Sequence, residues 1–139
     1  MEQQMLVPVL ALITWTMIIW VWMYALRIPA MQKAQLDPQD AAHPGALNVL
    51  PAQVRQVADN YNHLHEQPTV FYALAFYCVL AGTGDQLNIT LAWVYVGLRV
   101  LHSLVQCTVN KVALRFSVFA LSSLVLVAIT MRNLQALMQ

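Results

Sequence analysis

Long hydrophobic runs separated by short polar connections form the pattern of this chain. The runs predict four helices, at about residues 5–28, 51–81, 87–109 and 112–134. A helix needs about 20 mostly apolar residues to cross the hydrocarbon core of a bilayer, and each predicted helix is long enough. The 29–50 segment is polar and contains several helix breakers. The pattern therefore predicts an all-α membrane protein, a four-transmembrane-helix bundle with up-down topology.

Prolines and short turns give the expected limits of these helices. Pro29 is expected to end the first helix, because proline lacks the N–H that a helix interior requires. The second helix, starting at Pro51, would measure about 45 Å, so its first part is expected to lie outside the bilayer core. Pro68 is expected to kink that helix. A turn at 82–86 predicts an antiparallel third helix, and we expect residues 1–139 to form a single integral membrane domain.

The composition agrees with a membrane protein. Hydrophobic residues make up 60% of the 139 residues and charged residues only 9%, whereas soluble domains carry about 25% charge. The net charge of +1, without a basic run, gives no indication of nucleic-acid binding. Cys78 and Cys107 lie in apolar runs and are interpreted as small buried hydrophobic residues. The first run is too long and too rich in tryptophan for a cleavable signal, so we expect it to be retained.

The charges are distributed unequally between the two sides of the predicted bundle. One side carries Arg27, Lys33, Arg55, Lys111 and Arg115, and the other carries Glu2, Asp85 and Arg132. Because segments rich in lysine and arginine stay in the cytoplasm, we expect the 29–50 loop to be cytoplasmic and both termini to be non-cytoplasmic. The short loops and the lack of a sorting signal favour a bacterial inner membrane.

A polar stripe occupies one face of the predicted second helix. Arg55, Asp59, Asn62 and Glu66 are separated by four, three and four residues, which places them on the same face. The third helix carries a stripe of the same kind, formed by Arg99, His102, Gln106 and Asn110.

Counting residues from the turn between the two helices puts these stripes at the same depth. Glu66 is level with Arg99 and His102, Asn62 with Gln106, and Asp59 with Asn110. An arginine at the centre of a membrane helix costs about 2.5–3.5 kcal/mol on insertion scales, so Arg99 is expected to have a partner.

Two interpretations of the matched stripes stay open. They satisfy each other as a buried Glu66–Arg99 pair with hydrogen-bonded neighbours, or they line a cleft that opens toward the cytoplasm. Arg55, Lys111 and Arg115 would give such a cleft a cationic mouth, which suits a small anionic ligand.

A metal site is disfavoured. His63 and His65 are two residues apart, so on a helix they point away from each other. Only His63–Glu66 and His65–His102 are left as geometric pairs, and we predict no metal ligands.

At these residues the chain resembles the membrane-associated proteins in eicosanoid and glutathione metabolism, the MAPEG family, which includes microsomal glutathione transferases and leukotriene C4 synthase. The second helix of that family carries an arginine, an asparagine, a glutamate and a proline, in the order of Arg55, Asn62, Glu66 and Pro68. Arg99 followed by His102, and then Asn110 and Arg115, resembles the third helix and its connection to the fourth. The likeness extends over the whole chain in length, helix count and short turns.

The resemblance implies a four-helix protomer in a homotrimer, with glutathione as co-substrate between protomers near the cytoplasmic side. It further implies that arginines hold the glutathione carboxylates, and that Asn62 and Glu66 hold its amide and amino groups. Arg115 would be the catalytic residue that stabilises the thiolate, the nucleophile that conjugation needs. The remaining residues of the two stripes would be substrate-binding.

The chain also departs from the family pattern. Arg55 and Asn62 are seven residues apart where the family has four, and Asp59 in the intervening position would repel a carboxylate. His102 and Gln106 stand where some relatives have tyrosines. Two functions are therefore considered. One is a glutathione-dependent transferase or peroxidase that acts on lipophilic electrophiles from the bilayer. The other is a non-catalytic member whose polar stripes are structural, or bind a lipid headgroup or another small anion.

Overall fold

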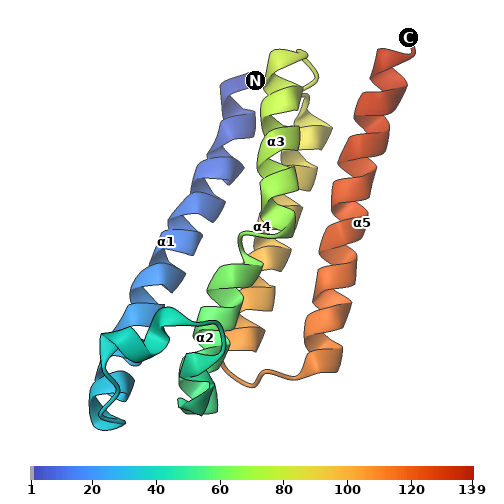
Figure 1. Ribbon diagram of the computed structural model, residues 1–139. Helices are drawn as coiled ribbons and strands as arrows, with labels where there is room; N and C mark the ends of the chain where they lie inside the picture. Colours follow the sequence, from blue (N-terminus) through green and yellow to red (C-terminus); the bar gives the residue numbers. More distant parts are fainter. Residues whose placement is uncertain (1) are drawn as a thin grey trace.

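A computed structural model describes residues 2–139, all of its regular structure being helical (Figure 1). The α-helices are α1 (Glu2–Lys33), α2 (Ala52–His63), α3 (Gln67–Leu80), α4 (Gln86–Cys107) and α5 (Val112–Leu137). Two short 3-10 helices, η1 (Pro38–Ala42) and η2 (Ala46–Val49), lie in the connection between α1 and α2. Three segments are long and apolar enough to cross a membrane: Gln3–Lys33, Gln86–Cys107 and Val112–Leu137. The predicted all-helical membrane class is confirmed.

The first helix does not end at Pro29, and that expectation is wrong. α1 continues through Pro29 to Lys33. Helices in membranes tolerate proline where the freed carbonyl finds another partner, and this proline lies near the polar end of α1. The chain leaves the helix at Gln35, two residues after Lys33, where a left-handed φ of 54° lets the Leu36 N–H bond to the Met31 carbonyl at 3.0 Å.

The expected single helix over 51–81 is broken in two. α2 ends at His63, and α3 starts at Gln67, directly before Pro68. Pro68 cannot donate to the Leu64 carbonyl, and its ring crowds that carbonyl, so the preceding turn leaves the helical path. Glu66 precedes α3 with φ −91° and ψ −99°, and its carbonyl accepts from the Thr69 N–H at 3.2 Å and from the Thr69 hydroxyl at 2.7 Å. The proline therefore starts a new helix rather than kinking a continuous one.

The last two helices are joined by a tight connection. Asp85 caps α4 by accepting the Asn88 N–H at 2.8 Å. α4 ends at Cys107, two residues earlier than expected, and α5 runs three residues beyond the expected 134. Between them Asn110 has a left-handed φ of 48°, and its N–H bonds to the Val105 carbonyl at 2.7 Å. This turn places the start of α5 beside the end of α4.

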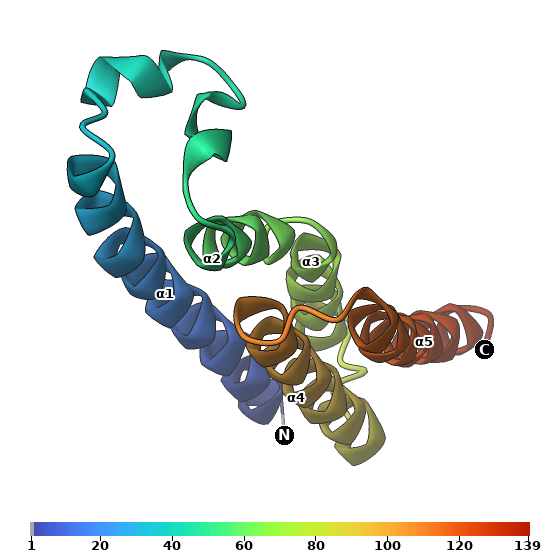
Figure 2. The ribbon, with the colours of Figure 1, turned by 90° about the horizontal axis from the view of Figure 1, so that it is seen from below.

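α4 packs against α1, α2 and α5. α1 packs against α2, α3 and α4, and α5 packs against α4 and α3 at the edge of the bundle (Figures 1 and 2). Phe71 of α3 stacks on Tyr95 of α4 with 4.6 Å between ring centroids, and both side chains are buried. Both chain ends lie at one end of the bundle, and the 34–51 connection forms an arc at the other end (Figures 1 and 2).

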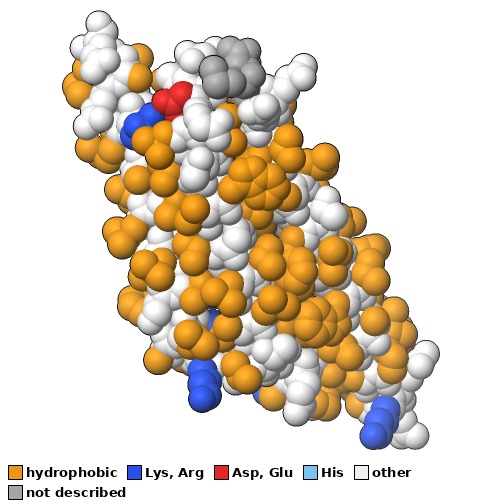
Figure 3. Space-filling model, turned by 180° about the vertical axis from the view of Figure 1, so that it is seen from behind, with side chains coloured by type: hydrophobic (Ala, Val, Ile, Leu, Met, Phe, Trp, Pro, Cys, Tyr) orange, Lys and Arg blue, Asp and Glu red, His pale blue; other side chains and the backbone are white. Residues whose placement is uncertain are grey.

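The lateral surface of the bundle is hydrophobic. Figure 3 shows hydrophobic side chains over most of one face, with lysine or arginine side chains at the lower end and another beside an acidic side chain near the upper end. Large apolar side chains such as Leu10, Leu124 and Phe116 are each more than 60% exposed. A soluble protein rarely exposes so much contiguous apolar surface, so this surface agrees with a membrane protein.

Candidate functional site

The two predicted polar stripes do not face each other. On α4, Arg99, His102 and Gln106 are buried, with exposed fractions of 0%, 2% and 4%, as predicted for an inward face, and Asn110 is half-buried beyond the helix end. The second stripe is on the outside of the protomer instead, because Arg55, Asp59, Asn62 and Glu66 are all exposed. The expected meetings of Asn62 with Gln106 and of Asp59 with Asn110 are therefore wrong.

The expected Glu66–Arg99 pair is also wrong. Glu66 lies in the break between α2 and α3, its side chain is 68% exposed, and its Oε2 atom is 3.1 Å from His63 Nδ1. Arg99 makes no ion pair with another residue in the described range 2–139.

A different stripe, shifted by one residue from the predicted one, faces inward on α2 and the start of α3. Gln56, Asn60, His63 and Gln67 have the same four, three and four spacing. Gln56 Nε2 donates to the Cys107 carbonyl at 2.9 Å, the rings of His63 and His102 lie 4.7 Å apart, and Gln67 accepts from the Tyr95 hydroxyl at 3.2 Å. Amides and neutral imidazoles cost less to bury than charges, which explains why this stripe turns inward. The inward stripe is visible in the sequence as the same spacing of polar residues. It carries no aspartate, glutamate, lysine or arginine, and this difference in charge indicates which stripe faces inward.

Buried polar atoms without partners gather where α2, α4 and α5 meet. We call Asn60, Arg99, His102, Ser103, Gln106 and Arg115 the loop-side cluster. Within residues 2–139, no hydrogen-bond partner is present for both side-chain polar atoms of Asn60, all three guanidinium nitrogens of Arg99, His102 Nδ1, Ser103 Oγ, Gln106 Oε1 and Arg115 Nε. Native proteins bond most of their buried polar groups, so such a group of atoms indicates partners outside this chain, such as water, a ligand or a second chain.

Arg99 is the most costly member of this cluster. Its side chain is fully buried, and its Cζ atom lies 5.7 Å from the centroid of the Phe119 ring. A cation–π contact contributes about 0.5–2 kcal/mol, whereas burial of an ion costs several kcal/mol. The Phe119 ring therefore offsets only part of the cost, and Arg99 keeps a strong attraction for a negative charge.

A cleft of about 200 Å³ lies beside the cluster, lined by His63, His102, Val112, Arg115, Phe116 and Phe119. Its polar walls come from α2, α4 and the first turn of α5, and its apolar walls from α5. The Arg115 Nη1 atom donates to Asn110 Oδ1 at 2.6 Å, which fixes the guanidinium at this cleft while its Nε atom is unbonded. The left-handed turn at Asn110 thus positions the residue that the sequence predicted as catalytic.

A second hollow, of about 460 Å³, lies between the 34–51 arc and the outer side of α1 and α2. Asp59 and Asn62 from the exposed stripe line it, together with Arg27 from α1 and residues 41–45, 47 and 48 of the arc. Arg55 and Glu66 line neither hollow. The predicted substrate-binding residues are therefore divided between an inner cleft, an outer groove and the open surface.

No group of three or more His, Cys, Asp or Glu side chains in the described part of the chain is arranged to hold a metal ion. Of the two pairs that the sequence allowed, His63–Glu66 forms. His65–His102 does not, because His65 Nδ1 bonds to the Tyr61 carbonyl at 2.8 Å. Cys78 and Cys107 are both buried and free, as expected.

The model of the MAPEG family matches residues 5–135 of the 139-residue chain. No curated protein and no solved structure matches the chain.

Proposed function

The chain belongs to the MAPEG family of membrane proteins in glutathione and eicosanoid metabolism, and on this premise we propose that it is a membrane-embedded enzyme that binds glutathione. The reaction is of the transferase or peroxidase type, and its second substrate is a lipophilic electrophile that enters from the bilayer. Arg115 stabilises the glutathione thiolate.

The position of Arg115 is the observation that supports this proposal most. Its guanidinium is held at the cleft by Asn110, with one nitrogen free of protein partners. A nearby guanidinium favours a thiolate over a thiol, because it interacts only with the charged form. The buried Arg99 adds to the preference of this region for an anion.

In a transferase reaction the thiolate sulfur supplies the electron pair of the new S–C bond. The bond from the attacked carbon to its leaving group breaks, and its electrons leave with that group. Val112, Phe116 and Phe119 give the cleft apolar walls, which suit a lipophilic acceptor beside the thiolate. The chain's own contribution is to hold the thiolate charged and to exclude water.

Assembly as a homotrimer is part of the proposal. The exposed stripe of Arg55, Asp59, Asn62 and Glu66 lies on a protomer whose lateral surface is otherwise apolar. Lipid is a poor environment for such a stripe, and a second protomer would cover it and place it at an interface. Glutathione would then contact Arg55, Asn62 and Glu66 of this stripe in one protomer and Arg115 in another.

We place the helices across the membrane in up-down order, with α2 and α3 together forming the remaining pass. Both termini are non-cytoplasmic in this proposal, and the 34–51 arc and the α4–α5 turn face the cytoplasm of a bacterial inner membrane. The basic side chains at the arc end of the bundle support this orientation (Figure 3).

Glutathione titration of the detergent-purified protein tests the proposal. We expect glutathione at millimolar concentration to raise the melting temperature, and the ultraviolet absorbance of a bound thiolate to appear. Arg115→Ala should bind glutathione nearly as well as wild type but lose the thiolate absorbance. It should also reduce kcat/KM by about 100-fold or more, the typical cost of removing one group that stabilises a developing or bound anion.

The matched control is Arg132→Ala, which removes an arginine from the opposite end of the same helix. It should keep the thiolate absorbance. A wild-type protein that glutathione does not stabilise would overturn the glutathione proposal, and an Arg115→Ala variant with normal absorbance would overturn the catalytic assignment.

A structural role for the cluster is the second candidate, and one observation favours it. Arg99 is not among the residues that line the inner cleft. In a non-catalytic member, Arg99 and its neighbours would serve to join protomers, and Arg99→Gln would then dissociate the oligomer without changing any ligand response.

A further inference from the structure

The groove under the 34–51 arc has a composition unlike that of the inner cleft. It is lined by Arg27 from α1, by Ala58, Asp59 and Asn62 from α2, and by Ala41, Ala42, His43, Pro44, Gly45, Leu47 and Asn48 from the arc. It therefore contains one cation, one carboxylate, two amides and one imidazole. The inner cleft, by contrast, has basic and apolar walls.

The polar side chains of this groove are free to bind a ligand. Arg27 and Asp59 carry opposite charges, yet neither forms an ion pair within residues 2–139. The side chains of His43, Asn48 and Asn62 make no hydrogen bond to another described residue. These three residues form hydrogen bonds only through their backbone atoms. Five polar groups thus line one groove of about 460 Å³ without satisfying each other.

The arc that covers the groove is built in a definite way. Asp37 and Asp40 form a capping box at the start of η1, with hydrogen bonds of 2.9 and 2.8 Å. Gly45 turns the chain with a φ of 85°, a conformation that residues with a side chain rarely adopt. Leu50 is buried and anchors the far end of the arc. The small side chains at 41, 42 and 58 leave the space that forms the groove.

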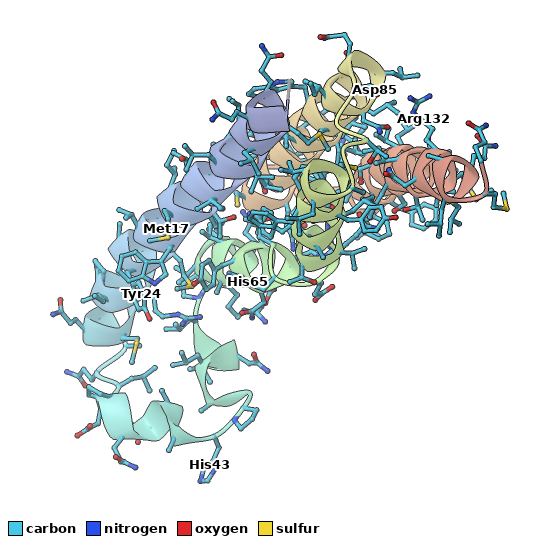
Figure 4. The ribbon with its side chains drawn as sticks, turned by 90° about the horizontal axis from the view of Figure 1, so that it is seen from above. Met17, Tyr24, His43, His65, Asp85 and Arg132 are labelled. Atoms are coloured by element: carbon cyan, nitrogen blue, oxygen red, sulfur yellow. The ribbon has the colours of Figure 1, made fainter. Side chains whose placement is uncertain are left out.

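The groove lies at the level expected for lipid headgroups. Arg27 follows Trp20, Trp22 and Tyr24 on α1, and such aromatic side chains mark the membrane–water interface. Figure 4 shows Tyr24 on the part of α1 that leads into the arc, and His43 on the arc itself.

We propose that this groove binds a small zwitterionic group, with its ammonium at Asp59 and its phosphate or carboxylate oxygens at Arg27. A simple anion would meet the repulsion of Asp59, and a simple cation that of Arg27, whereas a zwitterion is attracted by both. The amides of Asn48 and Asn62 can bond the remaining oxygen and N–H groups. Two sources carry this chemistry: the phosphoethanolamine headgroup of a lipid, and a free compound such as the glutamyl end of glutathione.

This inference goes beyond the proposed function and rests on it only if glutathione is the source. In that case Asp59, which would repel a carboxylate alone, selects the end of glutathione that carries a free ammonium group as well.

Binding to the detergent-purified full chain tests the inference. The probes are short-chain phosphatidylethanolamine, the matching phosphatidylglycerol without an ammonium, free phosphoethanolamine and glutathione. Calorimetry measures the affinity of each. Phosphatidylethanolamine should bind more tightly than phosphatidylglycerol. Asp59→Asn and Arg27→Gln should each weaken binding by about tenfold or more, since each removes a charged partner of the zwitterion. Lys33→Gln removes a nearby charge that does not line the groove, and it should leave binding unchanged.

The probes separate the sources and the two proposals. Binding of the lipid alone, sensitive to both substitutions, assigns the groove to a headgroup even if glutathione fails and the enzyme proposal falls. Equal binding of phosphoethanolamine and the lipid assigns it to a free zwitterion. In a third outcome, glutathione binds the wild-type protein and both variants, Asp59→Asn and Arg27→Gln, with equal affinity, and neither substitution changes the binding of any other probe. This outcome overturns the groove inference, while the proposed function stands. If no probe binds wild type, both are overturned.

Discussion

The two ends of the bundle both contain polar clusters, and they differ in how well these are hydrogen-bonded. The terminus-side cluster consists of Thr83, Asp85, Asn88, Arg132 and Asn133. Arg132 donates to Asn88 at 2.9 Å and pairs with Asp85 at 2.5 Å, and Asn88 donates to the Thr83 carbonyl at 2.7 Å. Figure 4 shows Asp85 and Arg132 next to each other at this end. None of its side chains is among the partnerless buried groups that make up the loop-side cluster.

The polar residues of the terminus-side cluster hold the helices together, whereas those of the loop-side cluster have buried atoms without a hydrogen-bond partner. The terminus-side cluster joins the α3–α4 turn to the end of α5 and is complete within one protomer. The loop-side cluster contains a buried guanidinium for which the protomer supplies only an aromatic ring. Such a buried charge is unfavourable unless a ligand or a second chain bonds to it. Substitutions in the two clusters should therefore change the free energy of unfolding with opposite signs.

Arg99→Met should have the largest effect. Because Arg99 is buried without a counter-charge, an apolar side chain of similar length should raise the stability of the ligand-free protein by about 1–4 kcal/mol. The same substitution should abolish stabilisation by an anionic ligand such as glutathione. Thermal unfolding in detergent, with and without the ligand, measures both.

Arg99→Lys keeps the positive charge and is the control, which should not gain stability. A loss of about 3–5 kcal/mol in ligand-free Arg99→Met would mean that Arg99 has a charged partner in the folded assembly. The contrast between the two ends would then be wrong.

Most of the fold could be predicted from the sequence, because apolar runs of membrane length leave the backbone few alternatives to a helix. The errors lie at prolines. Pro29 and Pro68 have the same covalent restriction, yet a helix continues through the first and restarts at the second. Pro29 is near a polar helix end, whereas Pro68 follows a turn in which His63 and Glu66 pair side chain to side chain. Such local compensation depends on three-dimensional neighbours and cannot be read from spacing.

The candidate site was predicted correctly on α4 but not on α2. The stripe on α4 is inward as predicted, whereas the counted level of α2 is wrong, because His63 instead of Glu66 lies against His102 and Gln67 bonds to Tyr95. The stripe chosen on α2 was one residue out of register, which is about 100° around a helix. Phe119, four residues after Arg115 on the same helix face, also belongs to the site, but an aromatic residue in an apolar run carries no distinguishing signal. Whether these residues bind glutathione stays a prediction.

Asn133→Ala should lower stability by about 1–3 kcal/mol, the cost of leaving buried groups unpaired. Asn133 is 5% exposed, its Nδ2 atom donates to the Ile129 carbonyl at 2.8 Å, and its Oδ1 atom accepts from Thr83. Thermal unfolding measures the loss, which ligand should not change. If the variant is as stable as wild type, the terminus-side cluster does not hold the bundle together.

A pair of hydroxyl deletions makes the contrast sharper. Thr83→Val removes a donor from a satisfied network and should cost about 1 kcal/mol. Ser103→Ala removes a buried hydroxyl that has no partner within residues 2–139 and should be neutral or slightly stabilising. The two variants are compared in one unfolding series. Equal losses from both would show that Ser103 is bonded in the folded protein and that the loop-side cluster is less open than the protomer indicates.

Asp85→Asn should have the smallest effect, because it removes a charge and little else. Asparagine caps a helix about as well as aspartate, so the bond to the Asn88 N–H is retained. Only the ion pair with Arg132 is lost, and both side chains are partly exposed, at 53% and 34%. An exposed pair contributes about 0.2–1 kcal/mol and is screened by salt, so the loss should shrink as ionic strength rises. Asp85→Ala also deletes the cap and should cost about 1 kcal/mol more, independent of salt. If Asp85→Asn is as damaging as Asp85→Ala at low ionic strength, the cap contributes nothing and the contrast between charge and hydrogen-bond network at this end is wrong.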